Sequence, residues 1–141
     1  MSYRPVLYAE DEENDAFFLK RAFKQAQVPN PLVVVPDGQA AIDYFSGAGI
    51  FTERSQYPIP ELVILDLKMP KLSGLEVLHW IRQDASLASL PVVILSSSTQ
   101  DDDMHRAYSH GANAYLIKPS DPEALQVMVK SIHGFWLNRI A

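Results

Sequence analysis

The apolar residues of this chain gather into five short runs, and longer amphipathic stretches separate them. Each run is rich in β-branched residues and lacks alternation of apolar and polar positions, which is typical of strands covered on both faces of a sheet. The five predicted strands are Val6–Ala9, Leu32–Val35, Leu62–Leu65, Val92–Leu95 and Tyr115–Ile117.

Amphipathic helical patterns follow each predicted strand. The acids Asp101–Asp103 suit the first turn of a helix, because negative charge is favourable at the positive end of the helix dipole. Asp121 suits an N-cap, and Pro122 suits the first helical position after it. The five predicted helices cover about residues 14–27, Gln39–Phe45, a segment opened at Gly74, a segment from Asp101 to about Gly111, and a segment that begins after Asp121.

This alternation of strands and helices predicts an α/β fold with helices on both faces of a parallel sheet. A chain of 141 residues is expected to form a single domain over residues 1–141, with an extension of the fifth helix at about residues 133–141. The long connection at residues 46–61 is expected to be an exposed loop, because it contains several glycines and prolines.

Charge and composition exclude several classes of function. The net charge is −5 and no basic run occurs, so we expect neither a nucleic-acid surface nor attachment to anionic lipid. No apolar segment approaches the ~20 residues of a membrane-spanning helix, and the stretch MSYRP lacks the apolar run of a signal peptide. The absence of cysteine excludes disulfides and thiol chemistry, and a cytoplasmic location fits.

Acidic residues directly follow two of the predicted strands. Glu10 and Asp11 end the first strand, and Asp66 ends the third. Open parallel sheets bind ligands beyond the carboxyl ends of their strands, where the strand order reverses. If the strand order is 2-1-3-4-5, that point lies between the first and third strands, and the three carboxylates converge. Like charges this close destabilise one another unless a hard cation such as Mg²⁺ neutralises them, which predicts a magnesium site.

The acids that come next have a simpler interpretation. Glu12, Glu13 and Asp15 open the first helix, where their charges interact favourably with the helix dipole. The same explanation could apply to the two acids that end the first strand, but their agreement with Asp66 favours a metal site.

The last two predicted strands end in groups that can bind a phosphoryl group. Ser96 ends the fourth strand, and its hydroxyl can donate to a phosphoryl oxygen. Lys118 ends the fifth strand, and its ammonium is a point cation with three donors. Alone, Ser96 could be a loop-capping serine and Lys118 a solvated surface lysine. Together with the carboxylates, they indicate phosphoryl chemistry that uses Mg²⁺.

Four motifs carry a family resemblance as a set, namely AEDE, LDLKMPKLSG, LSSS and YLIKP. From Val6 to about Ile132, the chain resembles a response-regulator receiver domain, similar to the chemotaxis receiver. The resemblance implies a flavodoxin-like receiver fold, which is a doubly wound five-stranded parallel sheet of order 2-1-3-4-5 with five helices. It also implies that Asp66 is the phosphoacceptor.

The same resemblance implies the ligands of the metal. Asp11 would bind Mg²⁺ directly, and the backbone carbonyl of Lys68 would be a further ligand beside Asp66. Glu10 would assist through a water molecule. Aspartate is commoner at this first acidic position in the family, and the longer reach of Glu10 suits the water-mediated role.

The resemblance also implies a switch. Ser96 would contact the phosphoryl group and move towards it, and Lys118 would pair with the same group. Tyr115 would be the switch aromatic that rotates inward. The Lys118–Pro119 bond would be cis, although Ser120 follows where phenylalanine is usual in the family.

The narrower resemblance is to the small receivers paired with bacterial phytochrome histidine kinases. It rests on the loop 46–61, on LSSS and KPS, and on the C-terminal FWL. It implies a stand-alone response regulator that accepts a phosphoryl group from a sensor histidine kinase and changes the surface of its fourth helix, fifth strand and fifth helix. Such a protein is not an enzyme beyond catalysing its own phosphorylation and dephosphorylation. The resemblance does not identify its downstream target, which the protein would reach by non-covalent contact or by phosphorelay.

Apolar residues near the C-terminus indicate a partner surface. Phe135, Trp136 and Ile140 lie near or beyond the usual end of a receiver domain. Exposed apolar surface of this kind marks interaction sites. We therefore expect a homodimer through the fifth helix or its extension.

Two other functions fit the sequence less well. A Mg²⁺-dependent phosphohydrolase of the haloacid dehalogenase type would carry a second acid two residues after its nucleophile, where this chain has Lys68. A receiver-like interaction module without phosphorylation would not need the complete set of site residues, which are Glu10, Asp11, Asp66, Ser96 and Lys118.

Overall fold

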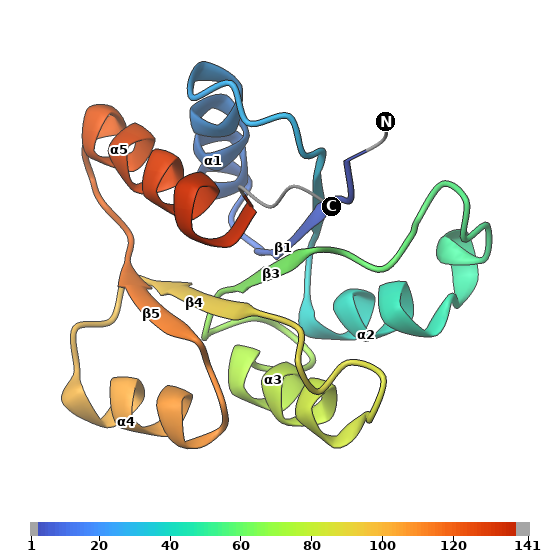
Figure 1. Cartoon of the computed structure of the whole chain (residues 1–141). Coiled ribbons are helices and arrows are strands. Elements are labelled where there is room, and N and C mark those ends of the chain that lie inside the picture. Colours follow the sequence, from blue (N-terminus) through green and yellow to red (C-terminus); the bar gives the residue numbers. More distant parts are fainter. Residues whose placement is uncertain (1–2, 138–141) are drawn as a thin grey trace.

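The computed structural model describes residues 3–137, which form an α/β fold around one parallel sheet. The sheet has five strands in the order β2-β1-β3-β4-β5, so the predicted order is confirmed. The strands are β1 Val6–Ala9, β2 Leu32–Val35, β3 Leu62–Leu65, β4 Val92–Ser96 and β5 Ala114–Ile117. Figure 1 shows the five helices around this sheet, and their bounds are α1 Glu13–Gln25, α2 Gly38–Ser46, α3 Gly74–Gln83, α4 Asp101–Ser109 and α5 Pro122–Ile132.

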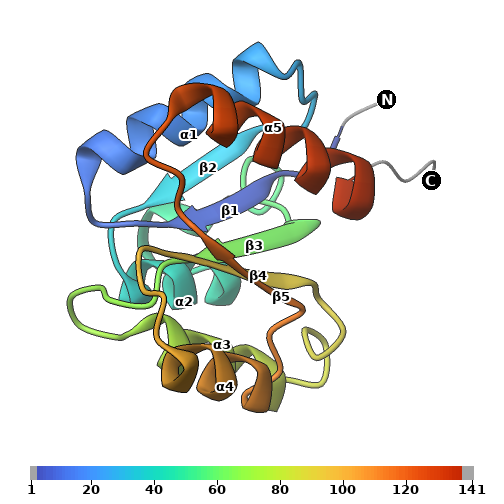
Figure 2. The same ribbon diagram turned by 90° about the vertical axis from the view of Figure 1, so that its left-hand side faces the viewer.

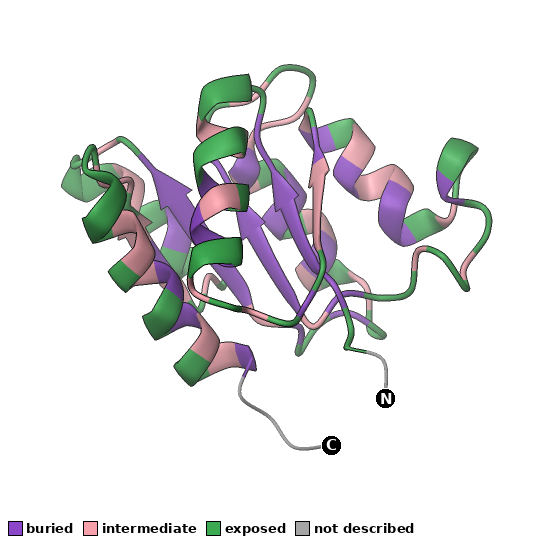
Figure 3. Ribbon diagram, turned by 90° about the horizontal axis from the view of Figure 1, so that it is seen from above, coloured by how far each residue is buried: buried purple, intermediate pink, exposed green. Residues whose placement is uncertain are grey.

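The helices form two layers, one on each face of the sheet. Helices α1 and α5 pack side by side on one face, and α2, α3 and α4 cover the other (Figure 2). The residues of β1 divide between these layers, since Leu7 packs with α2 and α3 while Tyr8 packs with α1 and α5. Both faces of the central strands are therefore buried (Figure 3), which explains why their sequences do not alternate.

Local hydrogen bonds fix where the helices begin. Ser73 accepts a hydrogen bond from the backbone N–H of Glu76, and the Glu76 carboxylate accepts one from Ser73 in return. This capping box satisfies two donors at the start of α3. Asp121 caps α5 by accepting from the N–H of Glu123, and Pro122 is the first residue of that helix, as the sequence predicted.

The connection at residues 46–61 is more closely packed than the sequence predicted. It contains a 3₁₀ turn at Gly49–Phe51, and the Phe51 ring is buried 5.1 Å from both Tyr44 and Tyr57. Arg54 donates to the carbonyl of Tyr44 at 2.6 Å. Most of the loop is exposed, as predicted, but the expectation is wrong for Phe51, because burial of its ring outweighs the local preference of glycine and proline for exposed turns.

The chain continues in a helical conformation beyond α5. One turn of π-helix spans His133–Leu137, where Leu137 is buried and Phe135 is 75% exposed. Ile140, which the sequence placed at a partner surface, lies outside the described residues. Within residues 3–137, each helix is too short or too polar to cross a lipid bilayer.

Gly74 allows α3 to begin directly against the end of β3. Its N–H donates to the carbonyl of Leu67 at 2.9 Å. A Cβ atom at this position would lie 2.1 Å from the carbonyl oxygen of Asp66, which is backbone and cannot rotate away. The lack of a side chain at Gly74 therefore helps to fix the backbone of Asp66.

We predict that Gly74→Ala lowers the free energy of unfolding by about 1–3 kcal/mol, because the added methyl group forces the backbone to shift. Urea denaturation measures the change. Gly134→Ala is the matched control, since a Cβ atom there meets nothing within 4 Å. Equal midpoints for the two variants would contradict the close packing at Gly74.

Candidate functional site

The register of the sheet brings two acidic residues side by side. Strands β1 and β3 are adjacent and parallel, and Ala9 pairs with Leu65. The next residue on each strand is Glu10 or Asp66, and the N–H of Asp66 still donates to the carbonyl of Ala9 at 3.1 Å. The two carboxylates thus leave the same edge of the sheet from neighbouring strands.

A cluster of carboxylates forms at this edge. Glu10, Asp11 and Asp66 each place one carboxylate oxygen within 4.8 Å of the other two. Glu10 and Asp66 are buried, and Asp11 is exposed. Oxygen ligands with one open side match the preference of Mg²⁺, which keeps several of its waters, so this donor set fits a hard divalent cation.

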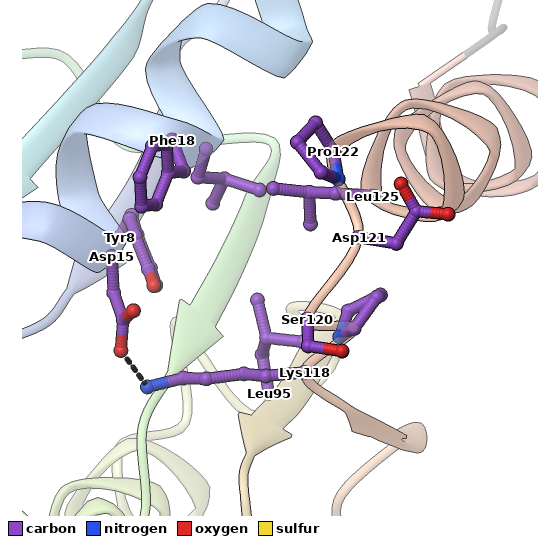
Figure 4. Close-up of a pocket in the computed structure, with 11 residues that line it drawn as sticks. Tyr8, Asp15, Phe18, Leu95, Lys118, Ser120, Asp121, Pro122 and Leu125 are labelled. Carbon is purple, nitrogen blue, oxygen red and sulfur yellow. Dashed lines mark hydrogen bonds and ion pairs between the residues drawn. The ribbon is translucent and has the colours of Figure 1, made fainter.

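Lys118, which follows the edge strand β5, supplies a positive charge to this cluster. It follows β5, where its N–H donates to the carbonyl of Ser96, and its side chain crosses β4 to reach the acidic cluster. The Nζ atom lies 2.6 Å from Oε1 of Glu10 and 3.2 Å from Oδ2 of Asp66. It also lies 2.8 Å from Oδ2 of Asp15, a contact drawn in Figure 4.

The three carboxylates keep the ammonium charged. Burial lowers the pKa of Lys118 more than any other single cause, but the hydrogen bonds to Asp15 and Glu10 and the charges of Asp66 and Glu10 together outweigh it. The pKa of Lys118 is therefore raised. The ammonium has three hydrogens and meets three acceptors, so its donors are fully used.

Hydrogen bonds from the Tyr8 hydroxyl and the Glu12 backbone N–H hold the Glu10 carboxylate in place. The buried hydroxyl of Tyr8 donates to Oε1 of Glu10 at 2.9 Å, and the N–H of Glu12 donates to Oε2 at 3.2 Å. Burial raises the pKa of Tyr8, and the charge of Glu10 raises it further, so the hydroxyl keeps its proton. Burial also raises the pKa of Glu10, against the hydrogen bond from Lys118.

Ser96 lies in the same cleft as the charged residues. This cleft has a volume of about 610 Å³ and lies at the carboxyl ends of the strands. Its lining includes Asp11, Asp66, Lys68, Ser96 and Lys118. The Ser96 hydroxyl oxygen accepts a hydrogen bond from the N–H of Ser98 at 3.1 Å, which leaves its own proton to donate. The chain therefore brings together all the residues for which the sequence predicted metal or phosphoryl contacts, with Glu10 buried beneath the cleft.

Tyr115 lies outside this cleft, on β5. Its ring is buried, and its hydroxyl donates to the carbonyl of Ser98 at 2.9 Å. Its N–H donates to the hydroxyl of Tyr108 on α4 at 3.0 Å. Tyr115 thus connects β5 with α4 and with the loop that carries the residues after Ser96.

Asp15 belongs to the site through its contact with Lys118, which was not predicted from the sequence. Its charge was assigned to the helix dipole together with those of Glu12 and Glu13. A signal was present, because Asp15 lies four residues before Leu19 and seven before Ala22, and both of these are buried. This helical spacing places Asp15 on the face of α1 that turns towards the sheet.

One expectation about the backbone is wrong. Residues 3–137 contain no cis peptide bond, so the Lys118–Pro119 bond is trans. The expectation came from family resemblance alone. The trans form of an X–Pro bond is favoured by about 0.5–1 kcal/mol.

Comparison with known families gives one match over most of the chain. Residues 6–130 match the model described as "Response regulator receiver domain". The match includes every strand of the sheet and each residue of the cleft named above.

Similar proteins with curated names match nearly the whole chain. The probable methanogenesis regulatory protein FilR2 of Methanothrix harundinacea is 39% identical over 132 residues, covering 94% of this chain and 83% of FilR2. The response regulator Rcp1 of Synechocystis is 34% identical over 135 residues, covering 96% of this chain and 90% of Rcp1.

Solved structures of similar proteins share the fold, and one of them holds a divalent cation. The Mn²⁺-bound form of Rcp1 superposes with a TM-score of 0.84 at 33% identity, covering 98% of this chain and 97% of Rcp1. The phosphorylated cyanobacterial phytochrome response regulator RcpA superposes with a TM-score of 0.88 at 33% identity, covering 99% of this chain and 98% of RcpA. On the shared motifs, fold and length of the match, this chain belongs to the response regulator receiver domain family.

Proposed function

We propose that this protein is a response regulator that accepts a phosphoryl group on Asp66 from a sensor histidine kinase. The observation that carries this proposal is the position of the Asp66 carboxylate. It lies 3.2 Å from the ammonium of Lys118 and next to the carboxylates of Glu10 and Asp11, at the wall of an open cleft. A nucleophile for phosphoryl transfer needs this combination of a carboxylate, a metal site and a cationic donor.

The proposed metal ligands follow from which oxygens are already engaged. Both carboxylate oxygens of Glu10 accept hydrogen bonds, Oε1 from Tyr8 and Lys118 and Oε2 from Glu12. This supports an indirect role for Glu10 through a water molecule. Asp11 and Asp66 would bind Mg²⁺ directly, with the backbone carbonyl of Lys68 as a further ligand. Bound Mg²⁺ would neutralise charge on the transferring phosphoryl group.

The proposed transfer forms an acyl phosphate. One carboxylate oxygen of Asp66 bonds to phosphorus while the bond between phosphorus and the histidine nitrogen of the donor breaks, and that nitrogen keeps the electron pair. Lys118 and Ser96 donate hydrogen bonds to phosphoryl oxygens. Water later hydrolyses the acyl phosphate at the same site, so the protein catalyses only its own phosphorylation and dephosphorylation.

The new phosphoryl charge would act on the surface formed by α4, β5 and α5. Ser96 is expected to move towards the phosphoryl group, and the change would reach Tyr115 through the loop at Ser98. The hydrogen bonds of Tyr115 to Ser98 and Tyr108 support this route, since they connect the loop, β5 and α4. A local charge would then bias two arrangements of one surface.

The relatives indicate the type of partner. RcpA is described as a phytochrome response regulator, and Rcp1 is a response regulator of similar length. We therefore propose a phytochrome histidine kinase as phosphodonor, a cytoplasmic location, and a downstream protein reached by non-covalent contact. The net charge of −5 favours a protein partner over nucleic acid or an anionic membrane surface.

Asp66→Asn is predicted to abolish phosphorylation and to leave the fold intact, because an amide of nearly the same shape lacks the nucleophilic charge. The measurement is intact mass after incubation with acetyl phosphate and Mg²⁺, with circular dichroism to follow the fold. Asp102→Asn, in the exposed first turn of α4, is the matched control and keeps full phosphorylation. Acid-labile phosphate on the Asp66→Asn variant would contradict the assignment.

Loss of a direct ligand should weaken metal binding. We expect Asp11→Asn to raise the Kd for Mg²⁺ by about tenfold or more, since even the hydrogen-bond partners of metal ligands contribute about 10–100-fold. Isothermal titration calorimetry measures the Kd, and Asp102→Asn corrects for the loss of one negative charge. The same Kd for both variants would argue against a metal site at Asp11.

The C-terminal surface supports a homodimer through α5 and its extension. Phe135 is 75% exposed and packs edge-on against Trp136, with ring centroids 4.6 Å apart. Such a pair offers rigid apolar area to a second copy of the chain.

We expect Phe135→Asp to convert a dimer into a monomer, because a carboxylate cannot be buried in an apolar interface without a large cost. Sedimentation velocity at high micromolar concentration measures this. Ile50→Asp is the matched control, with an equally exposed apolar residue (77%) in the α2–β3 connection. A wild-type monomer, with and without beryllofluoride, would count against the dimer.

A further inference from the structure

Asp15 is the carboxylate at Lys118 that neither the metal nor the phosphoryl group requires. It comes from the first turn of α1, and its Oδ2 lies 2.8 Å from Nζ of Lys118. Its side chain is 39% exposed, while those of Glu10 and Asp66 are 0% and 10% exposed. Asp15 thus approaches the ammonium from the solvent side of the site.

The three carboxylates around Lys118 have different competing partners. Glu10 and Asp66 belong to the acidic cluster that fits a divalent cation, and Asp15 does not. A bound cation would therefore compete for Asp66 directly and for Glu10 through a water molecule. Once Asp66 carries a phosphoryl group, the donor that now meets Asp66 is the one that would turn to a phosphoryl oxygen. Of the three carboxylates, only Asp15 lies outside the acidic cluster, so the divalent cation would not compete with Lys118 for it.

The stem of Lys118 has space beside it. A cavity of about 90 Å³ lies between α1 and α5, and Figure 4 shows Phe18, Leu95 and Leu125 around it, next to Lys118 and Asp15. The four-carbon stem of a lysine is flexible, and it can adopt several rotamers where neighbouring side chains leave space. The tip of the side chain is therefore held by its hydrogen bonds more than by close packing of its stem.

We propose that Asp15 is a positioning residue that holds the Lys118 ammonium over Asp66 while the divalent cation engages the acidic cluster. This inference rests on the proposed phosphorylation of Asp66. Asp15 keeps one of the three ammonium hydrogens, and so directs another towards the phosphoryl group. It touches neither the metal nor the phosphorus, and acts only through Lys118.

A simpler role for Asp15 is to stabilise α1 through the helix dipole, as any acid in that turn would. A variant of Glu13 distinguishes this role from the positioning of Lys118. Glu13 lies in the same turn and carries the same charge, and the ammonium of Lys118 contacts Asp15, not Glu13. Glu13→Gln therefore removes a charge of the same sign from the same turn and leaves the anchor of Lys118 intact.

The first test compares Asp15→Asn with Glu13→Gln in the full chain. With acetyl phosphate and saturating Mg²⁺, Asp15→Asn should lower the phosphorylation rate constant about three- to tenfold, because a catalytic donor that is misplaced loses much of its effect. Glu13→Gln should change it less than twofold. The Kd for Mg²⁺ should change equally in both variants, and Asp15→Glu should recover part of the lost rate.

The second test observes the Lys118 ammonium directly and does not depend on phosphorylation. Nitrogen-15 NMR detects a side-chain ammonium whose protons are protected by hydrogen bonds, and Lys118→Arg assigns its signal. With Mg²⁺ bound, we expect this signal to persist in the wild type and in Glu13→Gln, and to be lost in Asp15→Asn.

The outcomes separate this inference from the proposed function. Equal rates for Asp15→Asn and Glu13→Gln, or an unchanged Lys118 signal in Asp15→Asn, would overturn the positioning role. If the wild type takes up no phosphoryl group from acetyl phosphate, the proposed function fails, and the NMR signal alone decides whether Asp15 holds Lys118.

Discussion

Two buried carboxylates next to each other need a cation, and the packing of this site follows from that constraint. The parallel register of β1 and β3 places Glu10 beside Asp66, and both are removed from bulk water. An unpaired buried charge costs several kcal/mol, so a like-charged pair without compensation would strongly destabilise the fold. Lys118 removes much of this cost by contacting both carboxylates, and it must cross β4 to do so.

On the proposed function, the same electrostatic conflict would prepare the site for chemistry. A cluster with more negative than positive charge attracts a divalent cation, and the ammonium of Lys118 would meet an incoming phosphoryl oxygen. Stability and the proposed function would then use the same atoms. Tyr8 and the N–H of Glu12 fix Glu10, and Gly74 lets α3 close against the backbone of Asp66. The site is thus held by the central strands and by the helix that follows them, and less by its loops.

Most of the fold could be predicted because its signals are local. The short apolar runs gave the strands, since burial on both faces removes alternation, and Asp121–Pro122 marked the start of α5 correctly. The packing of Phe51 in the long connection was missed, because it depends on contacts with Tyr44 that no local pattern encodes. Asp15 was missed for a similar reason. The helix-dipole explanation was sufficient for its charge, and only the folded chain brings Lys118 to it.

The cis bond at Lys118–Pro119 was a different kind of error, since it came from resemblance and not from a force acting on these residues. The carboxylate cluster, in contrast, was predicted from strand ends and the chemistry of like charges, and the structure brings its members together.

The most direct test of a Mg²⁺-dependent phosphoacceptor at Asp66 is a crystal structure of the protein with Mg²⁺ and beryllofluoride. The account predicts beryllium bonded to an Asp66 oxygen, with Lys118 and Ser96 donating to its fluorides and Mg²⁺ bound to Asp11. Well-ordered crystals grown with both reagents that hold beryllofluoride on another residue, or Mg²⁺ away from Asp11 and Asp66, would contradict it.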